Sequence, residues 1–244
     1  MTSWQEARDL LHARIAPFGF ELLGAVASDV YNASLDDKLS DYRIALADHD
    51  GPSVALVVGN TRRLWPLFLD AFATTSLADQ ANPLDAYSRR HIGAAAAQLA
   101  SELGVVHALR FSFDPPPNTV AIQRLTALAG VAEVAPIGLC VHPTYGPWFS
   151  LRAAVVLGIA GPGASTSTAT CSACTSKPCL GPREQVMALG AAGFSRELLA
   201  DHWQTWLAMR DACPVGRAER YGDRQVRYHY LKDRSVLRDD SIGG

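Results

Sequence analysis

Two groups of residues in this sequence have types and spacings that suit chemistry. The first is an aromatic and polar turn from His142 to Trp148, followed by an apolar run that carries a single charge, Arg152. Buried arginines are rare unless an anion meets them. A turn with histidine, tyrosine and tryptophan beside such an arginine is therefore a candidate wall for a ligand. An ordinary loop next to an arginine that reaches solvent would give the same pattern.

The second group consists of cysteines in the C-terminal third, spaced C-x2-C-x4-C and followed much later by Cys-Pro-Val-Gly. Four thiolates suit an iron–sulfur cluster, although the usual bacterial spacing is C-x2-C-x2-C-x3-C-P. They also suit a tetrahedral zinc ion. Free thiols without any metal are the third alternative. The candidate metal ligands are Cys171, Cys174, Cys179 and Cys213.

The elements that must position these residues follow from hydrophobic periodicity. Apolar runs at 137–141 and 149–159, separated by a Pro/Gly-bearing turn, predict two paired strands. Runs at 42–48 and 53–59 predict a further hairpin. We expect an α+β fold with a mostly antiparallel sheet flanked by helices and a C-terminal helical cap that carries the cysteines. Helices are expected at residues 4–16, 61–74, 87–103 and 120–130, and at about 182–192 and 195–210, where they would return the chain to bring the cysteines together.

Composition limits the classes of function. The 244 residues carry a formal net charge of −2 and no basic stripe, which argues against nucleic acid as the main partner. No apolar run approaches the roughly 18 residues of a membrane span, and the first ten residues do not resemble a secretory signal. An odd number of cysteines in such a chain favours metal or redox chemistry in the cytoplasm. We expect a core at 1–160, a Gly/Ser/Thr linker at 161–170 and a cap at 171–244 packed on the core.

The run CVHPTYGPWFSLRAAVVL, residues 140–157, resembles the signature of the cobalamin-processing family of the MMACHC, or cblC, type. That signature reads C-I-H-P-x-(F/Y)-G-x-W-F-x-(I/L)-R. The N-terminal Pro-Phe-Gly-Phe-Glu and the C-terminal run 210–225 are also similar to the family, so that the resemblance covers roughly residues 8 to 230. The matching residues are Cys140, His142, Pro143, Gly146, Trp148, Phe149 and Arg152, with Arg210, Asp211, Ala212, Glu219, Arg220, Tyr221 and Gln225 further on.

This resemblance implies a nitroreductase-like fold that binds cobalamin with its lower dimethylbenzimidazole base displaced. It implies removal of the upper axial ligand, either as cyanide with a reduced flavin (FMN or FAD) or as an alkyl group transferred to glutathione. Arg152 and Arg210 match family arginines linked to glutathione, and we take them as candidate catalytic residues. The candidate cobalamin-binding residues are Ile122, Gln123, Cys140, His142, Pro143, Tyr145, Gly146, Trp148, Phe149, Leu151 and Tyr221.

The sequence departs from the family in two places and leaves other functions open. Ala127 stands where the family often has a histidine, and Val134-Ala135-Pro136 replaces a tyrosine-containing run, so the pocket should differ in detail. The cysteines would fit an electron-transfer oxidoreductase related to the queuosine-forming reductases, which pair cobalamin with a 4Fe–4S cluster. A non-enzymatic B12 chaperone, with a reductase or a B12-accepting protein as partner, is a further alternative. A monomer and a homodimer are equally compatible with the sequence.

Overall fold

The computed structural model describes residues 2–238, apart from the side chain of Ala192. The chain forms two units, which we describe separately. The first comprises residues 1–133 and 150–168, and the second comprises residues 134–149 and 169–244. We expected the core to end at residue 160 and the cap to begin at residue 171. The observed units differ from this division in one respect, since the segment 134–149 groups with the C-terminal part.

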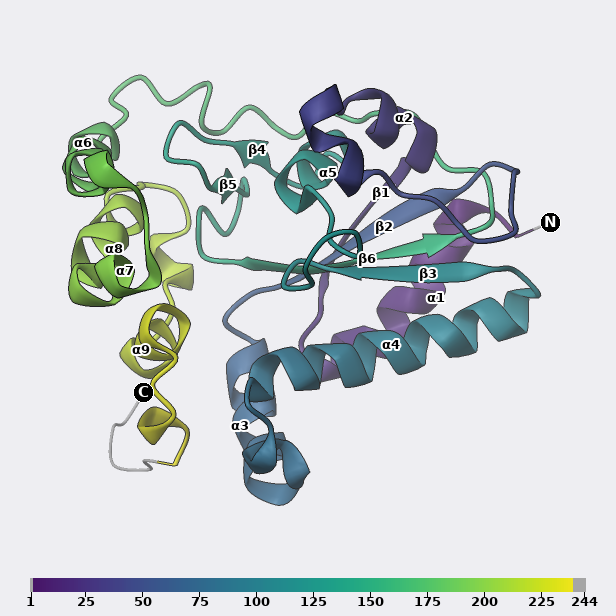
Figure 1. The fold of residues 1–244 in the computed structure, drawn as a ribbon, viewed down its shortest axis with the longest axis horizontal. Helices are drawn as coiled ribbons and strands as arrows, with labels where there is room; N and C mark the ends of the chain where they lie inside the picture. The colour runs from purple at the N-terminus through teal and green to yellow at the C-terminus, as the bar shows by residue number, and fades with distance from the viewer. Residues whose placement is uncertain (1, 239–244) are drawn as a thin grey trace. The chain divides into compact units, whose positions relative to one another are not determined.

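A four-stranded antiparallel sheet, in the order β1–β2–β6–β3, forms the centre of the first unit (Figure 1). Strand β2 is buried along its whole length and strand β6 along most of it, because both lie inside the sheet and are covered on both faces. Their apolar sequences, VALVVGN and SLRAAVVL, suit that position. The strands are β1 (Leu22–Ala27), β2 (Val54–Asn60), β3 (His107–Phe111) and β6 (Ser150–Leu157).

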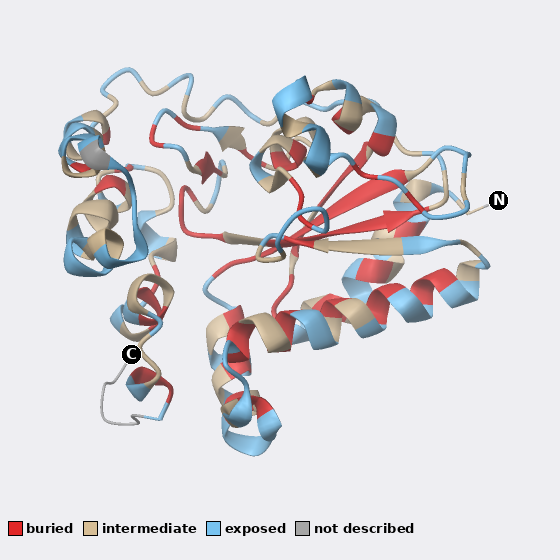
Figure 2. Ribbon diagram, in the orientation of Figure 1, coloured by how far each residue is buried: buried red, intermediate tan, exposed pale blue. Residues whose placement is uncertain are grey.

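Helices cover both faces of this sheet. Helices α1 (Trp4–Ile15) and α4 (Pro83–Leu103) lie on one face, while α2 (Ser28–Ala33) and α5 (Ile122–Leu128) lie on the other (Figure 1). In α4 the buried residues face the sheet and the exposed ones face outward (Figure 2). Helix α3 (Leu64–Thr74) packs against α4. Short 3₁₀ segments occur at Ala16–Phe18, Asp37–Tyr42 and Ser76–Asp79, the second with a kink at Leu39.

The ends of these helices follow signals in the sequence. The Ser3 hydroxyl accepts a hydrogen bond from the Glu6 amide at 3.2 Å and so caps α1. Gly104, with φ of +65°, ends α4 in the left-handed conformation that glycine adopts at low cost. The helices expected at 4–16, 61–74, 87–103 and 120–130 are confirmed, with small differences at their ends.

The hairpin expected from the runs at 42–48 and 53–59 is wrong. Residues 43–48 contain no strand, and β2 pairs instead with β1 and β6. The segment is held by side chains of α2. The Asn32 amide exchanges two hydrogen bonds with the backbone of Ile44, at 2.7 and 2.8 Å, and the Tyr31 hydroxyl donates to the Tyr42 carbonyl at 3.0 Å. These bonds satisfy backbone groups that a hairpin would otherwise have paired.

The second unit is mainly helical. Its helices are α6 (Leu180–Leu189), α7 (Arg196–Asp201), α8 (Trp203–Asp211) and α9 (Asp223–Leu231). The two helices expected at about 182–192 and 195–210 are confirmed, except that the second is split into α7 and α8 at His202. Across residues 2–238, no helix is both long and apolar enough to cross a membrane. Further 3₁₀ turns occur at Gly190–Ala192, Arg217–Glu219 and Ser235–Leu237.

The strand pair expected from 137–141 and 149–159 is also wrong. Strand β5 (Cys140–Val141) pairs with β4 (Glu133–Val134), and within residues 2–238 the partners of β6 are β2 and β3. The run before the turn is too short to match the eight residues of β6. The turn from His142 to Trp148 is therefore a connection between two sheets, and its geometry comes from its own hydrogen bonds.

Candidate functional site

The turn from His142 to Trp148 is closed by backbone and imidazole hydrogen bonds. The backbones of His142 and Gly146 exchange two bonds of 2.9 Å. The Nδ1 atom of His142 accepts from the amides of Thr144 and Tyr145, at 3.0 and 3.3 Å. Burial lowers the pKa of His142, which favours the neutral ring that this accepting role requires. The structure thus gives His142 a role within the turn, whereas Pro143 is exposed and free of such a role.

Two glycines let this turn pack directly against the backbone that follows Cys213. Gly146 has φ of +56°, and a Cβ atom placed there would lie 2.0 Å from the Val215 carbonyl oxygen. Gly216 has φ of +71°, and its Cβ would lie 2.2 Å from the backbone of Tyr145. Side chains at either position would separate the two segments. The turn and the Cys-Pro-Val-Gly segment are therefore held together by backbone contact.

Trp148, at the end of the turn, is enclosed by other side chains. Its indole ring is 1% exposed and meets the Tyr221 ring edge-on, at 5.7 Å between centroids. The guanidinium carbons of Arg210 and Arg220 lie 4.7 and 5.5 Å from the indole centroid. Phe149, the next residue, is also buried. A ligand would reach the face of Trp148 only if an arginine moved aside.

The two arginines above Trp148 differ in their partners. Arg220 forms ion pairs with Asp211 at 2.7 Å and with Asp223 at 3.1 Å. Arg210 donates to the Pro147 carbonyl oxygen and interacts with the Tyr230 phenol, and its Nε atom is buried without a hydrogen-bond partner in the described residues. Burial raises the pKa of Tyr230, and the nearby Arg210 opposes that rise. Arg210 thus keeps hydrogen-bonding capacity that Arg220 has already used.

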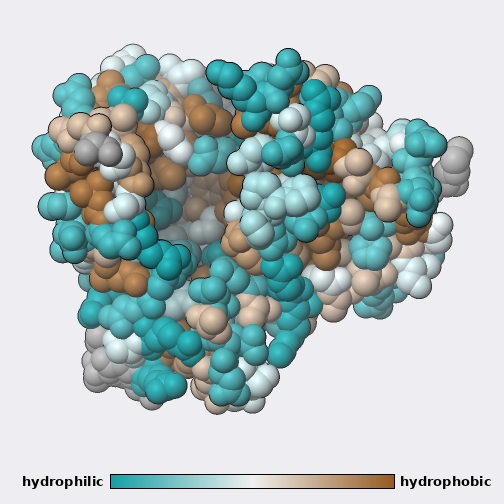
Figure 3. All heavy atoms as spheres, in the orientation of Figure 1, coloured by the Kyte–Doolittle hydropathy of each residue, from teal (hydrophilic) through white to brown (hydrophobic). Residues whose placement is uncertain are grey.

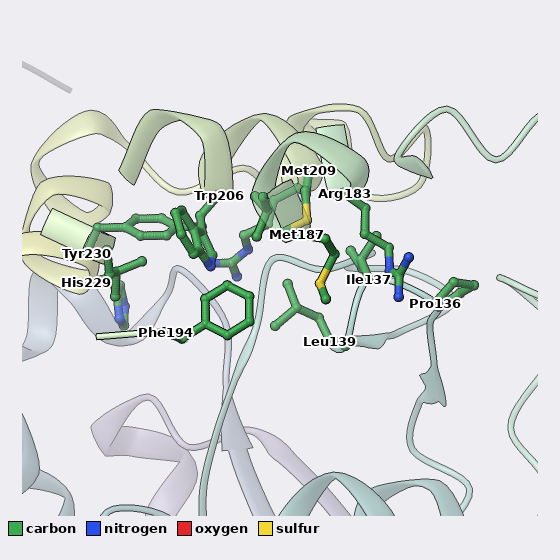
Figure 4. Close-up of a pocket in the computed structure, with 14 residues that line it drawn as sticks. Pro136, Ile137, Leu139, Arg183, Met187, Phe194, Trp206, Met209, His229 and Tyr230 are labelled. Atoms are coloured by element: carbon green, nitrogen blue, oxygen red, sulfur yellow. The ribbon is translucent and has the colours of Figure 1, made fainter. Parts of the chain in front are cut away.

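Arg210 also lines a large cavity of the second unit, which has a volume of about 560 Å³. Figure 4 shows Tyr230, Trp206 and Phe194 toward one end and Arg183, with Pro136 and Ile137, toward the other. Two arginines and no acidic residue are among the described residues that line it. A pocket with aromatic rings and cationic groups suits a flat heterocycle that carries a negative charge. The remaining lining residues are Gly138, Leu139, Val186, Met187, Leu199, Met209 and His229.

Part of this pocket is open to solvent through apolar side chains. Phe194 is 57% exposed and Met187 is 47% exposed. Figure 3 shows hydrophobic atoms in the region of α6 to α8. Met187 belongs to α6, and Phe194 lies in the connection before α7. The Phe194 ring lies against Gly190, where a Cβ would come within 2.1 Å of it, and meets Trp206 edge-on at 6.0 Å. Exposed rings of this kind are typical of a surface that receives a ligand or partner.

The candidate metal ligands line a second, smaller pocket of the same unit. Cys171, Cys174, Cys179 and Cys213 all face a cavity of about 20 Å³ with mostly apolar walls. Within the part of the chain that the structure describes, none of the four forms a disulfide. Burial raises the pKa of Cys213, and negative charge on Cys179 or Cys174 would raise it further. In residues 2–238 no group of three histidine, cysteine, aspartate or glutamate side chains is arranged to hold a single metal ion.

The fifth cysteine lies outside this pocket. Cys140 is buried in β5, and burial raises its pKa to about 12. Its thiol therefore stays protonated at neutral pH, which suits a small apolar packing residue better than a nucleophile. Tyr145 is half-buried, and its ring lies 4.7 Å from that of His142.

The remaining candidate residues belong to the first unit. Arg152 is 7% exposed, and its Nε donates to Asn60 Oδ1 at 2.7 Å across strands β6 and β2. Asn60 is fully buried and also donates to the Thr61 carbonyl at 2.9 Å. Arg152 thus joins two central strands. Leu151 and Ile122 are half-buried and Gln123 is exposed.

Sequence reasoning missed most of the residues that line the large pocket. Phe194, His229 and Tyr230 carry no motif, and they reach the pocket only because α7, α8 and α9 fold together. One signal was available, since Trp206 and Arg210 are four residues apart and so share a face of α8.

Comparison with known proteins identifies the fold. The chain is similar to the B12-trafficking protein CblC of C. elegans, a homologue of human MMACHC, with a TM-score of 0.68, 13% identity and 98% of each chain covered. It is also similar to epoxyqueuosine reductase, crystallised with a modified tRNA stem loop, with a TM-score of 0.50, 10% identity, and 89% of this chain and 67% of that chain covered. No protein-family model and no curated protein matches the sequence. At these identities the likeness concerns the fold, and it confirms the expected α+β class with an antiparallel sheet flanked by helices.

We predict that Gly146→Ala destabilises the second unit more than Gly138→Ala does. Both positions have positive φ, which costs alanine about 1–2 kcal/mol. Only the Gly146 substitution adds a clash with the Val215 backbone, since nothing lies within 4 Å of a Cβ at Gly138. Urea unfolding followed by tryptophan fluorescence measures the difference. Equal losses for the two variants would contradict the proposed backbone packing.

We predict that Arg152 and Asn60 are energetically coupled. Arg152→Met and Asn60→Leu should each lower the free energy of unfolding by about 1.5–3 kcal/mol, because each leaves a buried polar group without its partner. The double variant should cost less than the sum of the two. A purely catalytic Arg152 would instead show no loss of stability on substitution and no coupling.

We predict that His142 makes the fold less stable in mild acid. Its folded pKa is below the unfolded value of 6.5, so the unfolded chain binds the proton more readily and stability falls as pH decreases through about 6.5. His142→Asn keeps an acceptor for the two amides but does not titrate, and its stability should vary less between pH 7 and pH 5. His202→Asn, at an exposed position, is the matched control and should retain the wild-type pH dependence.

Proposed function

We propose that this protein binds cobalamin with its lower base displaced and removes the upper axial ligand. The observation that carries the proposal is the likeness of fold to a B12-trafficking protein over 98% of both chains. The resemblance of the run from Cys140 to Arg152 to the family signature is a second argument for it, drawn from the sequence.

The size of the large pocket suits one part of the ligand. At about 560 Å³ it is too small for a whole corrin with its side groups, but a flat base with its ribose and phosphate would fit. Trp206, Phe194 and Tyr230 offer ring faces and edges for the displaced dimethylbenzimidazole. Arg183 and Arg210 offer cations for the phosphate between that base and the corrin. Sequestering the base in this way would keep it away from cobalt.

Cobalt would supply the chemistry that breaks the bond to the upper ligand, and the residues of the chain would bind, orient and shield the cobalamin. Loss of the lower donor eases reduction of the metal and departure of the upper ligand. The electron donor for decyanation would be a reduced flavin, and the acceptor for an alkyl group would be the thiolate of glutathione. Of the two arginines assigned from the family, Arg210 is at the pocket, so we give it the role of binding a carboxylate or phosphate. Arg152, buried in the sheet, would act by positioning strands β2 and β6.

A second candidate is an electron-transfer oxidoreductase that uses cobalamin. Two observations favour it: four cysteines face one pocket, and the fold resembles that of epoxyqueuosine reductase. The two candidates share cobalamin binding and differ in the source of electrons. A chaperone that binds cobalamin and transfers it without turnover would share the binding step alone.

We predict that aquo-, cyano- and methylcobalamin each bind and shift their visible absorption toward the base-off form. Trp206→Leu should weaken binding at least tenfold, equivalent to about 1.4 kcal/mol, because the displaced base loses an aromatic partner. Trp4→Leu, in helix α1 of the first unit, is the matched control and should bind like the wild type. Absence of any spectral shift with correctly folded protein would refute the proposal.

The same mixtures of protein and cobalamin distinguish decyanation from dealkylation. Loss of cyanide on addition of reduced FMN indicates decyanation, and glutathione-dependent loss of methyl indicates dealkylation. Binding of all three cobalamins with neither reaction would reject the enzymatic proposal and favour the chaperone.

A further inference from the structure

Cys179 and Cys213 lie at the ends of two helices that pack together. Cys179 directly precedes α6, and its carbonyl accepts a hydrogen bond from the Arg183 amide at 3.0 Å. Cys213 lies just after α8, and its amide donates to the Arg210 carbonyl at 3.1 Å. Helices α6 and α8 contact each other, and both thiols line the same small pocket. The beginning of α6 is therefore next to the end of α8 at these two cysteines.

Both of these thiols are buried in one apolar cluster. Each of the two residues is 9% exposed, and they belong to the same group of packed side chains. They are close enough that negative charge on Cys179 raises the pKa of Cys213. Cys171 and Cys174 line the same pocket but are half-buried, in a segment without helix or strand. Cys179 and Cys213 are thus the pair that the packed helices hold in place.

The small pocket suits a bond between two thiols better than a metal centre held by four. Its volume is about 20 Å³, and in residues 2–238 no three histidine, cysteine, aspartate or glutamate side chains are arranged to hold a metal ion. Four thiolates would also bring negative charge into mostly apolar walls. A disulfide is uncharged, and it joins two sulfurs that are already in the pocket, so it needs no additional space.

The same two helices supply the cations of the large pocket. Arg183 lies four residues after Cys179, and Arg210 lies three residues before Cys213. Each arginine is therefore about one helical turn from one of the thiols. A bond between the thiols would restrict the separation of the helix ends that carry these arginines.

The small pocket and the large pocket also share side chains. Pro136 and Ile137 line both of them. Val186 of α6 and Met209 of α8 belong to the apolar cluster of the thiols and also line the large pocket. A movement of α6 relative to α8 at the thiols therefore changes the lining of the large pocket as well.

We propose that Cys179 and Cys213 form a reversible disulfide that fixes α6 against α8 and pre-organises the arginines of the large pocket. The disulfide does not depend on the proposed function, whereas its effect on cobalamin rests on it. The oxidant is a low-molecular-weight disulfide. The Cys179 thiolate attacks one sulfur of this molecule and releases the other as a thiolate, and the Cys213 thiolate then attacks the Cys179 sulfur and releases the second small thiolate. Two protein thiols are oxidised, one external disulfide is reduced to two thiols, and the two protons pass to the released thiolates.

The test is incubation of the folded full chain with oxidised glutathione, followed by alkylation of the remaining thiols, digestion with trypsin and mass spectrometry. The variant Cys171→Ser/Cys174→Ser is used, because it leaves Cys179 and Cys140 as the only partners within the chain for Cys213. We expect the peptide 211–217, which carries Cys213, to be recovered linked to the peptide that carries Cys179. Dithiothreitol should separate the two peptides.

Two results of this digestion would overturn the disulfide. One is complete alkylation of both Cys179 and Cys213 after oxidation, and the other is linkage of Cys213 to Cys140, which is buried outside the pocket. Circular dichroism before oxidation shows whether the double variant is folded. If it proves unfolded, the wild type is digested instead, and fragmentation of the linked peptide identifies the partner of Cys213.

Urea unfolding tests whether the bond fixes the helices. The disulfide closes the loop formed by α6, α7 and α8, so oxidation should raise the urea midpoint of the double variant. The matched control adds Cys179→Ser to that variant, and its midpoint should be the same under oxidising and reducing conditions. Equal midpoints for the oxidised and reduced double variant would contradict the proposed role of the bond.

A binding measurement separates this proposal from the proposed function. After removal of glutathione, the oxidised double variant should bind cyanocobalamin at least threefold more tightly than the reduced one, because arginines that are already ordered lose less freedom on binding. If the disulfide forms and neither state binds cyanocobalamin, the proposed function fails while the disulfide stands. If both states bind with the same affinity, the pre-organisation of the pocket is refuted.

Discussion

The second unit depends on one close approach of backbone to backbone, between the turn from His142 to Trp148 and the segment from Cys213 to Gly216. Gly146 and Gly216 permit it, since a Cβ at either position would lie about 2 Å from the opposing chain. On one side of this contact, the His142 ring organises the turn by accepting two amides. On the other side, Cys213 reaches the thiol pocket. The signature sequence and the cysteine sequence are thus parts of a single local structure.

The two arginines around Trp148 differ in how their charges are compensated. Arg220 is neutralised by Asp211 and Asp223, so it serves mainly to cover the indole. Arg210 has neutral partners and lines the large pocket, where its charge can meet an anionic ligand. The same helix α8 supplies Trp206 and Arg210 to that pocket and leads directly into Cys213. A short helix therefore connects a ligand site with a set of thiols.

Local sequence signals predicted the helices well, because caps, glycine stops and apolar periodicity act within a few residues. They failed for strand pairing. The partner of β2 was expected nearby in 42–48, but the side chains of Tyr31 and Asn32 hold that segment and leave β2 to pair with distant strands. Of the candidate site residues, Arg210 lines the large pocket and the four cysteines share a second cavity, and their roles stay predictions. Trp148 was expected in a ligand wall, but burial under two arginines cannot be read from spacing.

Hydrogen–deuterium exchange of the full chain, with and without aquocobalamin, tests the central claim that the second unit receives part of this ligand. Helix α8 and the residues of α9 that line the large pocket should exchange more slowly when cobalamin is bound, while α1, which contributes nothing to that pocket, should be unchanged. Slower exchange confined to the first unit, or no change anywhere at a saturating ligand concentration, would contradict the account.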